Sequence, residues 1–315
     1  MANLATLGIA KQGEFGTAIT DNWTPVKIME NVSLSLDIDR IENNEMFGGV
    51  DPYVSEMGTR AAAVSVEGWA YPLIIGHFLQ LIGGAPTTTG TAPNFEHTYT
   101  PGNNINPIYT FGFDETNGLD SYFQDVAADN LTLTQEVGQP LTYSLSAIAT
   151  DQVFGALTIE TTGVETRPFR FTDFTASVKV GTEDASDYKG FKNVSLSISS
   201  PIENIFTLDG NRTAYVQEFT GQREITLDGT LYFSNSEATE LKNAFVANTN
   251  VAVVLKWAIT DGAELEITIP SLRVLAHDWT RGRNETELTI SGQAFYNAGD
   301  ARAIRAVLKN TQATY

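Results

Sequence analysis

Two stretches of the chain share one alternation of apolar and small polar side chains. Residues 31–36 read NVSLSL, and residues 193–198 read NVSLSI. In an extended strand successive side chains point to opposite faces, so a period of two predicts a strand with one buried face. The same kind of strand is therefore predicted at two places about half a chain apart.

The similarity continues downstream at a constant offset. The tripeptide IEN occurs at 41–43 and again at 202–204, and VSVEGWAY at 64–71 aligns with ITLDGTLY at 225–232. The offsets are 193 − 31 = 162, 202 − 41 = 161 and 225 − 64 = 161. A register held over roughly forty residues indicates an internal repeat rather than chance. We therefore predict one domain fold present twice.

A long polar segment separates the two matched strands in each copy. It covers residues 39–62 in the first copy and 199–223 in the second. Structureless loops beyond about 15 residues are uncommon in compact domains unless they have a role. Both segments keep one length although most of their residues differ, which favours a geometric role, such as reaching a neighbouring subunit, over an idle inherited loop.

A helix is predicted after the second matched strand of each copy. In the first copy Pro72 suits a first helical position, residues 73–82 are almost wholly apolar, and two glycines follow, so this helix should be buried. In the second copy SNSE at 234–237 is a capping box and Asn248 ends the helix. Each copy then closes with a predicted hairpin, at 131–149 and at 272–295.

The copies also differ. The first inserts residues 85–107, rich in Thr, Pro, Gly and Asn, which predicts a surface loop. The second opens with an added strand pair within 169–180. Near the C-terminus we predict a short helix capped by Asp300, with Ile304, Val307 and Leu308 on one side.

The predicted fold class is mainly β, with two tandem homologous sandwich or barrel domains that each carry one α-helix. The predicted organisation is an N-terminal arm at 1–22, which either orders on assembly or frays, a first domain at 23–155, a linker at 156–166 and a second domain at 167–315. A chain of 315 residues is long enough for two such cores.

Composition narrows the function classes. No apolar run approaches the eighteen or so residues of a membrane span, the N-terminus lacks the pattern of a signal peptide, and cysteine is absent, so we expect synthesis and folding in a cytoplasm. The net charge is −19. Residues 1–155 contribute 4 − 18 = −14, and residues 156–315 contribute 15 − 20 = −5. Binding to nucleic acid needs the opposite sign, so this charge serves either solubility or a surface that must not hold a polyanion.

Residues suited to catalysis are few and separate. The three histidines lie in different segments, at His77, His97 and His277. Two pairs of carboxylates sit on single strand faces, Asp37 with Asp39 and Glu264 with Glu266, but no further ligands stand near either pair in sequence. We therefore predict no enzyme activity, no metal site and no cofactor.

The order strand, long loop, strand, helix, strand and hairpin resembles the tail-tube domain of tailed bacteriophages, which contractile injection machines share. The residues that carry the likeness are 31–38, the loop 39–62, the strand 63–71 with its helix, and their copies within 193–248. The likeness covers most of residues 24–150 and 188–298.

This resemblance implies rings of six domains whose inner strands join into one barrel, and rings that stack through the long loops and terminal arms. Two domains per chain then imply a trimer with pseudo-sixfold symmetry. A hexamer of whole chains, or a ring with one domain outside it, stays open because the two halves differ in charge. The family's lumen is generally acidic, so that DNA passes without sticking.

The resemblance further implies a structural virion protein that assembles in the host bacterial cytoplasm. Its expected partners are copies of itself, tape-measure, terminator and distal-tail proteins at the tube ends, and double-stranded DNA passing through without specific binding, with no membrane insertion. Expected inter-ring loop contacts are Met46, Phe47, Asp51, Tyr53, Phe206, Leu208 and Tyr215. Expected lumen residues are Glu67, Glu224 and Asp228.

Two other functions remain open at this point. A distal-tail or baseplate ring protein would carry an extra receptor-facing domain, for which little chain is left. A carbohydrate-binding two-domain β protein would group exposed aromatic side chains in one loop, whereas the four tryptophans are scattered over Trp23, Trp69, Trp257 and Trp279.

Overall fold

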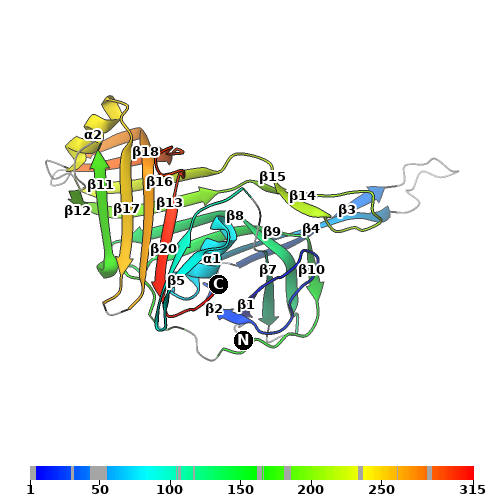
Figure 1. The fold of residues 1–315 in the computed structure, drawn as a ribbon. Coiled ribbons are helices and arrows are strands. Elements are labelled where there is room, and N and C mark those ends of the chain that lie inside the picture. The colour runs from blue at the N-terminus through cyan, green and yellow to red at the C-terminus, as the bar shows by residue number, and fades with distance from the viewer. Residues whose placement is uncertain are drawn as a thin grey trace.

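A computed structural model describes residues 5–29, 32–42, 55–103, 105, 108–115, 118–161, 165, 167–180, 186–232, 237–260, 262–281 and 286–315. Long antiparallel strands dominate the fold, with two short α-helices (Figure 1). The prediction of a mainly β protein is confirmed.

The first half of the chain contains β1 (Ala5–Lys11), β2 (Thr24–Val26), β3 (Val32–Glu42), β4 (Ser55–Trp69), α1 (Ile75–Gly83), β5 (Thr87–Thr91), β6 (Asn94–Tyr99), β7 (Tyr109–Glu115), β8 (Ser121–Glu136), β9 (Thr142–Ala149) and β10 (Asp151–Phe154). The second half contains the 3-10 helix η1 (Phe171–Asp173), β11 (Phe174–Val180), β12 (Ser186–Tyr188), β13 (Phe191–Ser199), β14 (Ile202–Ile205), β15 (Val216–Phe219), β16 (Glu224–Tyr232), α2 (Glu237–Val246), β17 (Val251–Ala258), β18 (Glu264–Arg281), β19 (Thr286–Ala294) and β20 (Arg305–Asn310).

Eight of these strands form one continuous layer, which we call the joined sheet. Its order is β3-β4-β9-β8 from the first half, followed by β13-β16-β19-β18 from the second. The two halves meet at a ladder of seven residue pairs, from Asn193 opposite Glu136 to Ser199 opposite Asn130. The chain therefore repeats one strand order and connects the two copies edge to edge.

The register between the first two strands of the joined sheet differs by two residues from one half to the other. Leu34 lies opposite Val64 in the first half, and the sequence offsets would place Leu196 opposite Ile225 in the second, whereas Leu196 lies opposite Leu227. Because side chains alternate with a period of two, a shift of two residues leaves each side chain on its original face. The buried and polar faces therefore correspond in both halves.

The core runs under the junction without a break. Val194, Leu196 and Ile198 of β13 are buried beside Leu131 and Leu133 of β8. All of these residues belong to one apolar cluster that also includes side chains of α1 and α2. Helix α1 is buried along its whole length, and Asn248 takes a left-handed conformation (φ 52°) after α2, as the sequence predicts for these two helices.

Strand pairing corrects several of the sequence predictions. The prediction of a short C-terminal helix is wrong, because residues 305–310 form β20, which pairs with β18 and β6. Ala306, Val307 and Leu308 are all buried, and a strand covered on both faces has a continuous apolar run that does not distinguish it from a helix. The surface loop expected at 85–107 contains the hairpin β5–β6 instead, and β6 pairs with β20.

The long loops are also partly strands. In the first copy β3 extends to Glu42 and β4 begins at Ser55, and in the second copy β14 and β15 form a two-stranded hairpin. The N-terminal region differs as well, since β1 pairs along its full length with β7 and so belongs to the first half's sheets rather than to a free arm. Its seven-residue ladder gives this segment backbone partners within the chain itself.

The C-terminal residues pack onto the first half. The Tyr315 ring lies edge-on to His77 and His97, with ring centroids 4.9 and 4.8 Å away. Lys11 Nζ donates to the backbone oxygen of Tyr315 at 2.7 Å, and Gly76 leaves room for the tyrosine ring where a Cβ would clash. The second half is thus joined to the first on the outer side as well as along the inner ladder.

Acid should destabilise the protein through His77. Burial, with a smaller contribution from the charge of Lys11, lowers the pKa of His77 to about 4, while an unfolded histidine titrates near pH 6.5. The unfolded chain then binds more protons between these values, so stability is complete above about pH 6.5 and falls by on the order of 3 kcal/mol as the pH drops to about 4. Urea unfolding at pH 7 and 4.5 should show a smaller loss for His77→Gln than for the parent, and an equal loss would contradict the assignment.

The junction ladder should control the stability of both halves together. Ser197 lies in the middle of β13, opposite Thr132 of β8 and Thr226 of β16. Proline there removes a backbone donor from a central strand and leaves its acceptor unpaired, which should cost at least about 1–3 kcal/mol, whereas Ser197→Ala should cost under about 1 kcal/mol. Urea unfolding followed by tryptophan fluorescence should remain one transition in both variants. A Ser197→Pro variant whose first half unfolds at the parent's urea concentration would show that the halves are independent.

Candidate functional site: the polar face of the joined sheet

Small polar side chains cover the face of the joined sheet that lies opposite the core. Following the register from strand to strand, one row of directly opposed residues runs through Glu67, Ser144, Thr132, Ser197, Thr226 and Gln293. The row continues from the first half into the second, and all of these side chains are polar. The polar face is therefore one surface built by both halves.

Hydroxyl groups interact across the junction on this face. The hydroxyl oxygens of Thr134 and Ser195 lie 3.2 Å apart, and Thr132 Oγ1 donates to Ser197 Oγ at 3.2 Å. Such short side chains bond to one another and project little beyond the backbone. The face is consequently smooth compared with one that carries long side chains.

Most of the charged groups on the polar face are carboxylates. They occur at Asp37, Glu67, Glu136, Glu224, Asp228, Asp278 and Glu287. Among nearby cations, Lys192 forms an ion pair with Glu287, and the Arg273 guanidinium lies 5.4 Å from the centre of the Phe295 ring. The surface is therefore acidic over both halves.

The structure places the three expected lumen residues on this one face. Glu67 lies on β4 and is half-buried, while Glu224 and Asp228 lie on β16 and are exposed. Their common face follows from their even spacing on strands whose other face is buried. That this face lines a channel remains a prediction.

The joined sheet ends in two free edges. Within the described residues, β3 pairs only with β4, and β18 beyond Leu272 pairs only with β19. The corresponding inner strands β8 and β13 each have neighbours on both sides. A long edge strand with unpaired backbone groups is a template for another strand.

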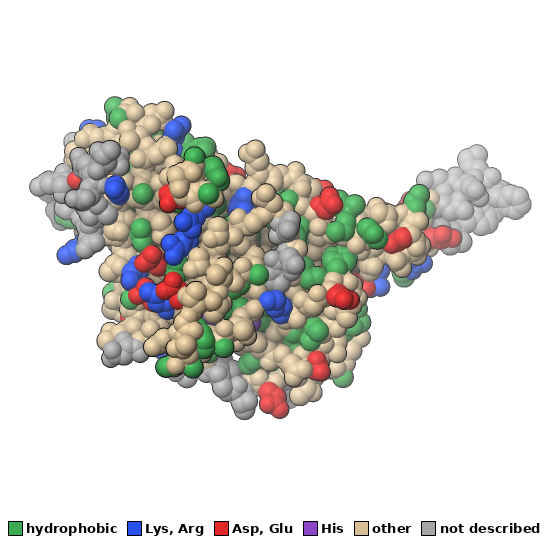
Figure 2. All heavy atoms as spheres, in the orientation of Figure 1, with side chains coloured by type: hydrophobic (Ala, Val, Ile, Leu, Met, Phe, Trp, Pro, Cys, Tyr) green, Lys and Arg blue, Asp and Glu red, His purple; other side chains and the backbone are tan. Residues whose placement is uncertain are grey.

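Two hairpins extend from one end of the molecule, the outer part of β3–β4 and the β14–β15 hairpin (Figure 1), and the space-filling view shows a narrow extension on this side (Figure 2). They contact each other, because the Arg60 amide donates to the Arg212 carbonyl at 2.8 Å and an Arg212 guanidinium nitrogen lies 3.7 Å from the Met57 sulfur. Arg60 also forms an ion pair with Asp151 at 2.9 Å. The hairpins of the two halves thus form a single projection.

The expected inter-ring residues are found only in part. Met46, Phe47, Asp51 and Tyr53 lie outside the described residues. Phe206, Leu208 and Tyr215 lie on or beside the β14–β15 hairpin and are exposed by 36, 108 and 62%. The last three side chains are therefore available for contact with another molecule.

The carboxylate pair at Glu264 and Glu266 has a structural role. Lys256 reaches both carboxylates, and Lys309 lies 3.1 Å from Glu264. Across the described ranges, no group of three or more potential metal ligands occurs, and none of the helices is long and apolar enough to cross a membrane. The molecule's distinctive surfaces are the polar face, the free edges and the projection, which are suited to assembly.

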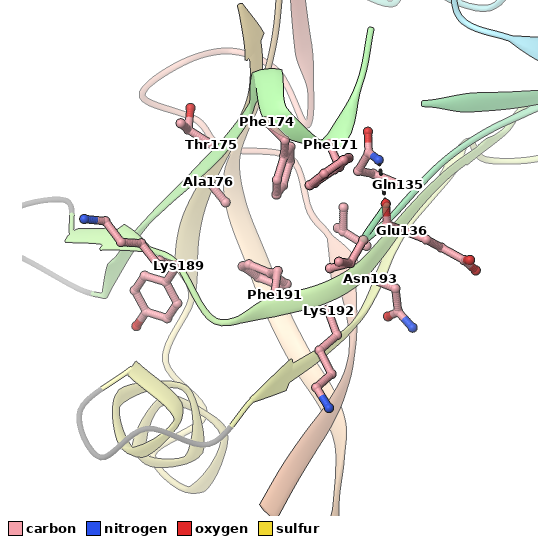
Figure 3. Close-up of a pocket in the computed structure, with 13 residues that line it drawn as sticks. Gln135, Glu136, Phe171, Phe174, Thr175, Ala176, Lys189, Phe191, Lys192 and Asn193 are labelled. Carbon is pink, nitrogen blue, oxygen red and sulfur yellow. Dashed lines mark hydrogen bonds between the residues drawn. The ribbon is translucent and has the colours of Figure 1, made fainter. Parts of the chain in front are cut away.

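The sequence did not indicate an apolar pocket where the two halves meet. Its lining comes from the end of β8, from η1 and β11, and from the segment 188–194 (Figure 3). These segments are up to about 60 residues apart, since 194 − 135 = 59. One lining residue, Phe171, is an exposed aromatic side chain, but this exposure is visible only in the folded structure.

Comparisons with known proteins give a family. No match was found among curated proteins. Two solved structures are similar: the tail of an empty gene transfer agent particle with C6 symmetry, at 13% identity and a TM-score of 0.32, and the virion of a native gene transfer agent particle, at 14% and 0.30. Each match covers 39% of this chain and 92% of the other. The family model described as phage tail tube protein matches residues 2–302, nearly the whole sequence, and the protein therefore belongs to the phage tail tube protein family.

Proposed function

We propose that this structural tail protein is the subunit of the tail tube, and that it forms rings by pairing the free edge of β18 with β3 of the next copy. The observation that carries the proposal is the β8–β13 ladder inside the chain. This ladder shows, within one chain, the strand pairing that two copies would have to form.

The argument follows from the repeated strand order. In each half the joined sheet runs through four strands, so β3 corresponds to β13 and β18 corresponds to β8. The joint between β8 and β13 is made within the chain, and its counterpart between β18 and β3 requires a second copy. A contact between two different surfaces, repeated by rotation, closes into a ring.

Three copies are the proposed ring. Six-domain rings are implied by the resemblance, and each chain supplies two domains, which gives a barrel of 3 × 8 = 24 strands from the eight strands of the joined sheet. The polar face lies inside this barrel, because the other face is covered by the core and by α1 and α2. Closure also removes both free edges, which protects them from uncontrolled pairing.

Exposed apolar side chains mark the same joint at the hairpins. Ile202 on β14 is buried against Ile108 and Ala127 of the first half. Its counterpart by the sequence repeat, Ile41 on β3, is 58% exposed. Burial of one large apolar side chain contributes about 1.5–3 kcal/mol, so covering Ile41 would favour association.

The matching surface for Ile41 lies on the second half. Asp228 and Glu67 are matched by the sequence repeat, and they lie opposite Ser291 and Ser144. Phe295 and Ile148 each follow these serines by four residues, so Phe295 corresponds to Ile148. Ile148 packs beside Ile202 in the chain, whereas Phe295 and the adjacent Tyr296 are 40 and 68% exposed. The two open ends of the molecule therefore expose apolar groups where the inner joint buries them.

The acidic polar face suits a channel for DNA. Phosphates and carboxylates repel one another over about 8 Å at physiological ionic strength, and the short hydroxyl side chains offer few groups that would hold a phosphate. We propose passage of double-stranded DNA without specific binding, no enzymatic activity, and tape-measure, terminator and distal-tail proteins as partners at the tube ends. The completed tube is part of the virion.

An engineered disulfide should report the ring joint. In the first half, Glu67 lies opposite Ser144, which lies opposite Thr132 on β8. In the second half, the matched residue Asp228 lies opposite Ser291, which lies opposite Ala276 on β18. Thr132 faces Ser197 within the chain, so Ala276 should face Ser35 of the next copy, which matches Ser197 at an offset of 162. The natural chain has no cysteine, so Ala276→Cys with Ser35→Cys should give disulfide-linked trimers on non-reducing gels after oxidation.

Two control variants make this result interpretable. Thr132→Cys with Ser197→Cys should oxidise within one chain and run as a monomer, which shows that this pair geometry allows a disulfide. Each single cysteine variant should form no ladder beyond dimers. A ladder of the double variant that extends to six chains would replace the trimer by a hexamer, and monomers alone, with the control oxidised, would overturn the joint.

The charge of the polar face should decide whether DNA is retained. Changing Glu224 and Asp228 to lysine alters the face by +4 per chain, and DNA fragments should then sediment with the assembled protein in a strongly salt-dependent manner. The parent should leave DNA in the supernatant. Asp300→Lys with Glu14→Lys makes the same change at exposed positions off the face, and equal retention by this control would contradict a lumenal location.

A further inference from the structure

The apolar pocket where the halves meet has an aromatic wall. Phe171, Phe174 and Phe191 point into it, and Lys189 and Lys192 also belong to its lining, with side chains that extend away from these rings (Figure 3). Its volume is about 250 Å³. An apolar cavity of about 150 Å³ accommodates a benzene ring, so this pocket can accept a branched aliphatic side chain.

A fully exposed leucine lies in the connection between the two strands of the β14–β15 hairpin. Leu208 sits between β14 and β15 with an exposure of 108%, and Phe206 beside it is also exposed. The Asp209 carboxylate accepts hydrogen bonds from the Asn211 amide at 3.0 Å and from Asn211 Nδ2 at 3.1 Å, and Gly210 takes a left-handed φ of +85°. These local hydrogen bonds, together with the contact of Arg212 with β4, hold the turn that carries the leucine.

The leucine and the pocket lie at opposite ends of the same strand. Strand β13 begins at Phe191 in the pocket wall and ends at Ser199, just before the β14–β15 hairpin, and β8 ends at the pocket (Figure 1). Nine residues of strand span roughly 27 Å. One end of the molecule therefore carries an apolar projection and the other an apolar recess.

The charges around the two features differ. Glu203, Asp209 and Glu218 are exposed on the hairpin and its turn, where Arg212 is the basic residue, so this end is net acidic. The pocket lining contains Lys189 and Lys192, which are balanced by Glu136 and by Glu287, the ion-pair partner of Lys192. An acidic hairpin is therefore repelled less by this recess than by a second acidic hairpin.

From these features we infer that Leu208 of one copy inserts into the pocket of a copy in the next ring, with the acidic hairpin beside Lys189 and Lys192. The partner is a second copy of this chain, and the contact rests on the ring proposed above. It joins two different surfaces along an axis where rotation does not close it, which generates a filament. It also deepens the proposed function by naming the recess that receives the projection.

Substitution of the leucine should separate stacking from ring closure. In Leu208→Asp a carboxylate would have to enter an aromatic pocket, so we expect rings of the parent's diameter and at least a tenfold rise in the protein concentration needed for tubes, seen by electron microscopy and sedimentation. Leu119→Asp is the matched control, because Leu119 is 61% exposed in the turn before β8 and should stack as the parent does. Tubes of Leu208→Asp at the parent's concentration would overturn the inference.

A second disulfide tests the contact directly. Val137 lines the pocket and is 65% exposed, so Leu208→Cys with Val137→Cys should cross-link rings in oxidised tubes, whereas within one chain the two residues are at opposite ends. If oxidised tubes lack this cross-link while the Ala276→Cys, Ser35→Cys variant does cross-link, the proposed stacking contact is wrong and the proposed ring joint still holds. Absence of rings and of both cross-links in the double variants would remove both proposals.

Discussion

The antiparallel ladder between β8 and β13 fixes how the two halves of this chain relate to each other. Its seven pairs continue a four-stranded layer of the first half directly into the four-stranded layer of the second. Because backbone hydrogen bonding sets strand spacing and direction, the core below and the polar surface above must continue as well. The aromatic pocket at the meeting of the halves and the placement of the hairpins at the far end both follow from this one arrangement.

The alternation of apolar with small polar residues gives the layer two different faces. Valine, leucine and isoleucine bury one face in a core common to both halves, while serine and threonine on the other bond to one another across the strands. A two-residue register difference between the halves is tolerated because it keeps every side chain on its face. The same property allows a duplicated sequence to diverge while its strands still join.

Sequence reasoning was most successful where periodicity is strong. The two matched strands, both helices and both closing hairpins were predictable, and the even spacing of Glu67, Glu224 and Asp228 from buried neighbours put them on one face. Periodicity failed at β20, where burial on both sides erases alternation, and at 85–107, where threonine and glycine concealed the β5–β6 hairpin. The pocket could not be predicted, because its walls come from segments that only the tertiary fold brings together.

Strand β20 connects the two halves on the side away from the inner ladder. It pairs with β18 of the second half and with β6 of the first, so the halves are held on the outer side as well as along the inner ladder. Two separate attachments prevent the halves from hinging about one seam. In the ring proposed above, each chain supplies two domains that are already joined. Half of the joints in a ring of separate domains would then form within single chains, at the effective concentration of one molecule, and only the other half would require collisions between chains.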